Sequence, residues 1–267
     1  MLSKFRNLFS PAAESAPPPA IPAGSRAYAV GDVHGRADLF TALIAAVDAD
    51  DVARGAAQTT IVLLGDLVDR GPDSAGVLAL ARSWHARRPL RALMGNHEEM
   101  FLGSFDSEEV LRQFLRFGGR ETVLSYKIDP VTYSAASLAE TQALMRAVVP
   151  ADDIAFMRGM EDMVTIGDYL FVHAGIRPGV PLDQQRTGDL RWIREPFTTC
   201  KDSLGPVVVY GHTIYEAPEI GFNRIWIDTG AYQSGRLTAI GLEGTNRWLI
   251  EATETHGTIS VSQRSVA

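Results

Sequence analysis

The sequence predicts an α/β fold arranged as one large domain. Short apolar runs rich in β-branched residues alternate with segments whose apolar residues recur at helical spacing, a pattern typical of strands alternating with helices. Several of these runs end at a glycine that is followed by an aspartate, an asparagine or a histidine. The chain of 267 residues is long enough for such a domain to bury a substantial core.

Eight apolar runs account for the predicted strands, and two patterns of helical spacing lie between them. The first pattern runs from Phe40 to Val47 and the second from Val77 to Trp84, where Pro72 suits a helix entrance. The predicted strands are Ala27–Val30, Thr60–Leu64, Leu90–Met94, Tyr169–Val172, Val207–Tyr210, Arg224–Ile227, Leu237–Leu242 and Arg247–Ala252.

The segment 106–158 breaks this alternation and is predicted to be a helical insertion. Asp106 and Glu109 are suited to cap a helix that carries Val110, Leu111 and Phe114. An insertion between two strands is a candidate cap over a site, and it can equally add packing to the core. Both interpretations are compatible with the pattern.

The two ends of the chain are expected to lie outside the folded domain, which should span 26–261. Residues 1–25 are rich in Pro, Ala and Ser and lack the apolar stretch of a signal peptide, which predicts a flexible leader. An alternative for this leader is a short membrane-surface helix, since Lys4 and Arg6 stand among apolar residues. Residues 262–267 are expected to form a C-terminal tail.

The composition is typical of a soluble globular protein, with 46% hydrophobic and 21% charged residues. The formal net charge is −7 and there is no long basic run, which argues against a nucleic-acid backbone as partner. No apolar run is long enough for a transmembrane segment. The single cysteine, Cys200, cannot form an internal disulfide, so a reducing, cytoplasmic location fits best.

Metal-competent side chains follow each of the first five predicted strands. Because open α/β sheets bind their ligands at the carboxyl ends of strands, we expect these side chains to converge on one site. A single Gly-Asp turn would be ordinary loop chemistry, whereas five such strand ends in order indicate a site. The residues are Asp32 and His34, then Asp66, Asp69 and Arg70, then Asn96 and His97, then His173, and finally His212.

Six of these residues form a candidate ligand set for two metal ions. Asp32 and His34 are two residues apart, so in an extended segment both side chains point to one side and can bind the same ion. Asp66 can reach that ion with one oxygen and bridge to a second ion with the other. Asn96, His173 and His212 are expected to complete the second position. A mixed oxygen and nitrogen set without thiolate suits Mn, Fe or Zn, and two such ions can activate water for attack on a phosphoester.

The remaining residues are suited to proton transfer and phosphate binding. His97 is a candidate general acid for the leaving oxygen, with Asp69 holding its other ring nitrogen. Arg70 offers a planar pair of donors to phosphate oxygens, although an adjacent Asp and Arg can also be a surface ion pair. The second phosphate-binding arginine is Arg194, or else Arg177 or Arg191.

The motifs GDVHG, GDLVDRG and GNHE, followed by HAG and GHT, resemble those of the calcineurin-like metallophosphoesterases, specifically the phosphoprotein phosphatase branch. The resemblance covers roughly Tyr28 to Ala231. It implies a central β-sandwich flanked by helices, a dinuclear metal centre, and the ligand and acid roles given above. The element from Trp192 to Glu195 is similar to that of lambda-type bacterial serine/threonine phosphatases, which favours Arg194 and implies a phosphoprotein or a small phosphoester as substrate. The two divalent ions are expected to be Mn, with Fe or Zn as alternatives.

Two other functions remain as alternatives. The symmetrical diadenosine tetraphosphate hydrolases share this fold and metal site, but they typically have alanine at the position of Asp69 and GNHD in place of GNHE. Both differences favour the protein phosphatase. A non-catalytic phosphate-binding module is the second alternative, and the intact ligand set argues against it.

Overall fold

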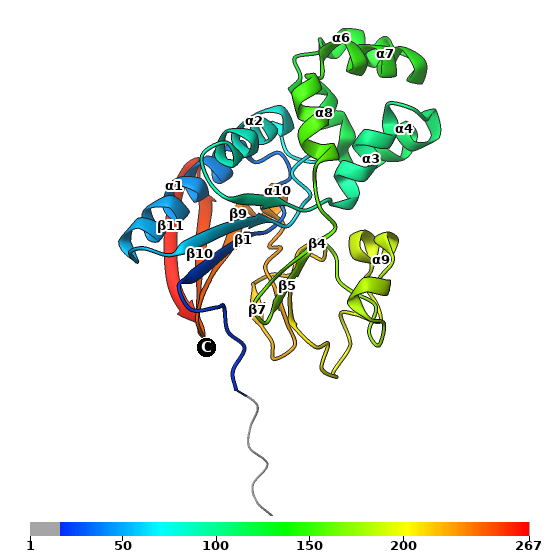
Figure 1. Cartoon of the computed structure of the whole chain (residues 1–267). Helices are drawn as coiled ribbons and strands as arrows, with labels where there is room; N and C mark the ends of the chain where they lie inside the picture. The colour runs from blue at the N-terminus through cyan, green and yellow to red at the C-terminus, as the bar shows by residue number, and fades with distance from the viewer. Residues whose placement is uncertain (1–16, 267) are drawn as a thin grey trace, which may run out of the picture.

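The computed structural model describes residues 17–266, in which two β-sheets pack face to face with helices on their outer sides (Figure 1). This is the predicted α/β architecture, a central sandwich flanked by helices. Within the described range, no helix combines the length and the apolar character that crossing a membrane requires.

The first sheet has six strands in the order β11-β10-β9-β1-β2-β3. The strands β1, β2 and β3 are parallel, because a helix connects each to the next, whereas β9, β10 and β11 are antiparallel neighbours. Their bounds are Ser25–Val30 (β1), Gln58–Leu63 (β2), Leu90–Ala92 (β3), Arg236–Glu243 (β9), Asn246–Thr255 (β10) and Thr258–Val266 (β11).

The second sheet has five strands in the order β4-β5-β6-β8-β7. Its three central strands are parallel, and a short antiparallel strand closes each edge. The edge strands β4 and β7 escaped prediction because they are short and only partly buried. The bounds are Met163–Ile166 (β4), Tyr169–Val172 (β5), Val207–Tyr210 (β6), Glu219–Ile220 (β7) and Arg224–Trp226 (β8).

Both faces of the central strands are buried, which explains why these strands appear in the sequence as continuous apolar runs. In β1, Ala27 and Ala29 face the second sheet, while Tyr28 and Val30 face the helices. The strand β5 alternates in the same way between the space between the sheets and the outer face of the second sheet.

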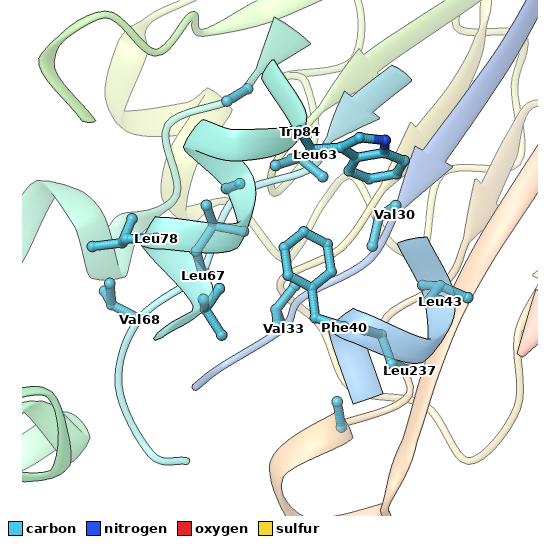
Figure 2. Packing of buried hydrophobic residues seen from close by; sticks show 14 of the residues in the cluster. Val30, Val33, Phe40, Leu43, Leu63, Leu67, Val68, Leu78, Trp84 and Leu237 are labelled. Carbon is cyan, nitrogen blue, oxygen red and sulfur yellow. The ribbon is translucent and has the colours of Figure 1, made fainter. Parts of the chain in front are cut away.

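Two helices cover the outer face of the first sheet, α1 (Ala37–Ala53) and α2 (Ser74–His85). Figure 2 shows Phe40 of α1 and Trp84 of α2 packed over Val30, and the two aromatic rings lie 6.0 Å apart. The helix α2 begins where Asp73 accepts a hydrogen bond from the Gly76 N–H. The helices therefore anchor the loops that leave β1 and β2.

The predicted helical insertion is present and stands at the top right of Figure 1. Its first helix is capped by Ser107, whose hydroxyl accepts from the Val110 N–H, and not by Asp106 as predicted. Phe114 stacks on Phe101 of α3 with 5.2 Å between the rings, so the insertion extends the core. The helix α3 (Asn96–Ser104) precedes the insertion, whose elements are α4 (Glu108–Phe114), a π-helical turn η1 (Leu115–Gly119), α5 (Arg120–Ser125), α6 (Pro130–Ala135), α7 (Leu138–Val148) and α8 (Ala151–Arg158).

Three short helical elements complete the described chain. They are η2 (Leu182–Gln184), α9 (Thr187–Trp192) and α10 (Ala231–Ser234).

Both predicted ends of the domain differ from the structure. The expected tail from 262 instead lies in β11, which pairs with β10 up to Val266, because polar side chains suit this exposed edge strand. The expected leader includes Ile21, which is buried and donates its N–H to the Gly244 carbonyl at 2.8 Å. The rest of the predicted leader, 1–16, lies outside the described residues.

Candidate metal centre

The loops after β1, β2, β3, β5 and β6 meet at one edge of the sandwich, as the strand-end motifs predict. Several of their residues adopt left-handed backbone conformations that are uncommon for residues other than glycine. Such strain persists where the surrounding structure enforces it, which is common at functional sites. The residues with positive φ in these loops are His34, Asp66, Asp69, Arg70 and His212.

Asp66 lies between two groups of histidines. Its Oδ2 is 3.5 Å from the Nε2 of His34 and 3.8 Å from the Nε2 of His97, whereas its Oδ1 is 3.4 Å from the Nε2 of His173. Two sets of ligand atoms each lie within 4.8 Å of one another, one being His34, Asp66 and His97, the other Asp66, His173 and His212. This is the arrangement expected of a carboxylate that bridges two ions.

Asn96 joins the histidines of the second group. Its Oδ1 is 3.0 Å from the Nε2 of His173 and 2.9 Å from the Nδ1 of His212. Asn96 and His97 are in the first turn of α3 and not in a loop, so the helix holds their relative orientation.

Asp32 reaches the site through the loop that contains His212. Its Oδ2 accepts a hydrogen bond from the His212 N–H at 3.0 Å. Gly211 is required for this approach, because a Cβ at that position would lie 2.0 Å from the Asp32 Oδ1. Asp32 belongs to neither three-residue group, yet it contacts a member of the second group through this bond.

The donor atoms of the site fit divalent cations. The Nδ1 of His34 lies 2.7 Å from the Val68 carbonyl and that of His173 lies 2.8 Å from the Leu64 carbonyl, so each Nδ1 donates and each Nε2 carries a lone pair. These lone pairs face the oxygens of Asp66, which are also acceptors. Three buried atoms that can bind a cation have no hydrogen-bond partner among residues 17–266, namely Asp32 Oδ1, His34 Nε2 and His212 Nε2.

Burial dominates the titration of these groups. Burial and the charges of Asp228 and Asp66 raise the pKa of Asp32 well above its ordinary value. Burial and the neighbouring His173 lower the pKa of His212 to about 3, and burial also lowers the pKa of His34 and of His173. The histidines are therefore neutral at neutral pH, which is the form that binds metal.

His97 and Asp69 form a buried pair. The Nδ1 of His97 is 2.6 Å from the Asp69 Oδ2, and its Nε2 is 2.8 Å from a guanidinium nitrogen of Arg70. Because a guanidinium only donates, Nε2 is the acceptor and Nδ1–H donates to Asp69. Burial alone would lower the pKa of His97, but the carboxylates of Asp66 and Asp69 outweigh it and raise this pKa.

The three candidate arginines differ in their partners. Arg177 pairs with Asp189 at 2.6 Å, and Arg191 pairs with Asp162 at 2.6 Å. The exposed guanidinium of Arg194 makes no hydrogen bond or ion pair within residues 17–266, and its charge contributes to the lowered pKa of His212.

Several residues of the site were not assigned by the sequence analysis. The buried carboxylate of Glu98 accepts hydrogen bonds from the N–H groups of Asp66, Leu67 and Gly95 at 2.7–3.0 Å. Its place as the last residue of the GNHE motif is the sequence signal that could have identified it. The ring of Tyr232 lies 5.0 Å from the Arg70 guanidinium carbon, for which the sequence offers no signal.

Asp228, in the loop after β8, is a further residue that the sequence analysis did not assign. Its carboxyl group lies beside that of Asp32, and burial raises the pKa of Asp228 to about 6.

Comparison with known proteins places this site in context. The chain is 29% identical to serine/threonine-protein phosphatase 1 of Salmonella typhimurium, over 79% of this chain and 89% of that protein. It is 25% identical to the asymmetrical bis(5'-nucleosyl)-tetraphosphatase PrpE of Bacillus velezensis, over 78% of this chain and 86% of that protein.

Among solved structures, a cold-active protein tyrosine phosphatase has the same fold, with a TM-score of 0.58 and 21% identity. The alignment covers 91% of this chain and 81% of that one. The family model described as calcineurin-like phosphoesterase matches residues 25–224, which contain the parallel strands β1, β2, β3, β5 and β6 and every candidate ligand. This chain therefore belongs to the calcineurin-like phosphoesterase family, whose members use dinuclear metal centres.

Proposed function

We propose that this phosphoesterase hydrolyses phosphoserine and phosphothreonine monoesters with two divalent ions, of which Mn is the expected species and Fe or Zn are alternatives. The observation that carries the proposal is the position of Asp66, whose two oxygens face different histidine groups beside the His97–Asp69 pair. Asp32, His34 and Asp66 would hold one ion, and Asp66, Asn96, His173 and His212 the other. The bound ions would activate a water molecule and neutralise the ester.

The proton required by the leaving group would come from His97 in its charged form, with Nε2 protonated from solvent, which the carboxylates of Asp66 and Asp69 favour by raising the pKa of this histidine. Asp69 accepts from Nδ1–H and so directs Nε2 toward the substrate side, where it can donate to the departing serine or threonine oxygen. Arg70 now donates to that same Nε2. A bound phosphate would attract the Arg70 guanidinium, leaving Nε2 free to carry the transferred proton. Arg194 would supply the second guanidinium to the phosphate.

Two observations favour phosphoprotein over nucleotide substrates. Asp69 contacts His97, and this is the position at which the symmetrical nucleotide hydrolases typically have alanine. The Salmonella relative, which aligns over most of both chains, is named a serine/threonine phosphatase. Nucleotide hydrolysis is the second candidate, because the Bacillus relative with a similar alignment is named a bis(5'-nucleosyl)-tetraphosphatase.

The two functions can be separated by assaying both substrate classes with one enzyme preparation. Metal-stripped protein is reloaded with Mn, Fe, Zn or Mg and tested on a phosphoserine peptide and on diadenosine tetraphosphate. We expect a larger kcat/KM for the peptide, with Mn giving the highest activity. A large preference for the dinucleotide would reverse the assignment, and full metal loading without hydrolysis of either substrate would support a binding module.

A further inference from the structure

The helical insertion contacts the candidate acid pair through one buried side chain, Thr122 of α5. Its hydroxyl oxygen is 2.6 Å from the Asp69 Oδ1 and 2.8 Å from the Asp69 backbone nitrogen. Thr122 is 53 residues away from Asp69 in the sequence, and both side chains are fully buried. The contact is therefore a product of the tertiary fold.

The carboxylate of Asp69 accepts hydrogen bonds from two side-chain donors. Thr122 donates its only hydroxyl proton to Oδ1, and His97 donates Nδ1–H to Oδ2. The Ser74 hydroxyl, at the start of α2, lies 2.9 Å from the Thr122 oxygen and can donate to it. Each oxygen of Asp69 thus has a donor, which fixes the plane of the carboxylate and with it the orientation of the His97 ring.

A second contact ties the insertion to the next residue of the loop. The Arg70 N–H donates to the Gly118 carbonyl at 3.0 Å. Gly118 has φ of +109°, and a Cβ there would lie 2.8 Å from the Arg70 side chain, so glycine is required. Asp69 and Arg70 both have left-handed backbone conformations, and the insertion supplies a hydrogen bond to each of them.

We propose that Thr122 is a positioning residue, which holds Asp69 and through it orients His97 for proton transfer. The inference rests on the acid role proposed above for His97. It assigns the insertion a part in catalysis that is separate from covering a substrate. Without the Thr122 hydroxyl, Oδ1 of Asp69 would be a buried acceptor with no side-chain donor among residues 17–266, and the carboxylate could rotate away from His97.

The test compares Thr122→Val, which keeps the shape and removes the hydroxyl, with Thr122→Ser, which keeps the hydroxyl. The matched control is Thr141→Val, since Thr141 is buried in α7 of the same insertion and its hydroxyl, within the described part of the chain, bonds only the Ser137 carbonyl. For Thr122→Val we expect kcat on an alkyl phosphoester to fall by roughly 10- to 100-fold, the loss of one hydrogen bond to a charged group. KM and metal content should stay unchanged, Thr122→Ser should restore most of the turnover, and Thr141→Val should match wild type.

A role in positioning also predicts dependence on the leaving group. p-Nitrophenol hardly needs a proton, so Thr122→Val should lose much less activity on p-nitrophenyl phosphate than on the alkyl ester. In a His97→Ala background, Thr122→Val should lower kcat no further, because the two residues act through one step.

Four results would overturn the inference. If Thr122→Val lowers kcat equally on both esters, or if its effect adds to that of His97→Ala, Thr122 acts only on stability or on the metal site. If the loss of kcat in His97→Ala depends on the leaving group but Thr122→Val shows no loss, the role of Thr122 is contradicted and the acid role of His97 stands. Equal losses of His97→Ala on both esters would remove the acid role, and the inference with it.

Discussion

The ring of His97 has a partner on each nitrogen, and the two partners have different functions in the proposed mechanism. The contact with Asp69 is buried and fixed by further hydrogen bonds, whereas the contact with Arg70 links two groups that would both serve the substrate. A catalytic acid needs one permanent partner and one that can be exchanged. The geometry around His97 meets both requirements.

Replacing His97 with alanine is expected to lower kcat on an alkyl phosphoester by about 10²- to 10⁴-fold, the usual contribution of general acid catalysis. The loss should be much smaller on p-nitrophenyl phosphate. Steady-state kinetics on the two esters, with metal content measured in parallel, checks this. A variant that had also lost its metal would point to a ligand role for His97, which lies in one of the two candidate ligand groups.

Arg194→Ala is expected to raise KM for a phosphopeptide by roughly tenfold, because one charge-assisted hydrogen bond to phosphate is lost. The control is Arg177→Ala, which removes an arginine that already pairs with Asp189. Initial-rate kinetics of both variants measures the two KM values. A larger rise in KM for Arg177→Ala than for Arg194→Ala would assign the phosphate contact to Arg177.

At the scale of elements, a network of charged residues joins α1, β1, β9 and the loop that follows α2. Asp51, near the end of α1, accepts from Arg26 at 2.7 Å and from Arg88 at 2.5 Å. The side chain of Arg26 is fully buried and is held on its other side by Glu243 at 3.0 Å. This network closes the end of the first sheet that lies opposite to the metal-binding loops.

Asp51→Asn is expected to lower the free energy of unfolding at neutral pH by about 2 kcal/mol, because the buried Arg26 guanidinium loses one of its two carboxylate partners and keeps only Glu243. Burial alone would raise the pKa of Asp51, but hydrogen bonds from Thr59, Arg26 and Arg88 lower it in the folded state. A lowered folded pKa gives stability that is present above the unfolded value of about 4 and is lost as the pH falls through the folded pKa.

The difference in the free energy of unfolding between wild type and Asp51→Asn should therefore be largest above about pH 5. It should become smaller as the pH falls below about 4. Urea unfolding at a series of pH values measures it, with the exposed Asp183→Asn as control. A difference that widens as the pH falls would show that the network does not depend on a charged Asp51.

The elements that the sequence analysis identified are those with a strong periodic pattern. The bounds of β5 and β6 were predicted to the residue, because each is a fully apolar run that stops at a different kind of residue, His173 after β5 and Gly211 after β6. The cap of α4 and the strand β11 were missed for a common reason. Both consist of polar, largely exposed residues, whose structure depends on one hydrogen bond or on pairing with a neighbouring strand.

At the scale of the whole molecule, the candidate metal site joins loops from both sheets. Asp32, Asp66 and Asn96 follow strands of the first sheet, while His173 and His212 follow strands of the second. Ions bound among these side chains would connect the two halves of the sandwich. Metal binding should therefore stabilise the whole domain and not only the loops.

Chelation of the metal is expected to lower Tm by about 5 to 10 °C, which corresponds to an ion present at roughly a hundred times its Kd and bound only to the folded chain. Calorimetry of the metal-loaded and chelated protein measures the shift. Asp66→Asn, which weakens both ligand groups, should show a smaller shift. An identical Tm before and after chelation of the wild type would contradict a bound metal.

The sequence by itself determined the α/β class, the five loops that carry metal-competent residues and the family, because apolar periodicity and short motifs are properties of neighbouring residues. Only the tertiary structure decided how those loops face one another, that Glu98 holds the loop after β2, and that Thr122 reaches Asp69. These contacts join residues dozens of positions apart. Their formation depends on the packing of two sheets and an insertion, which local sequence patterns do not specify.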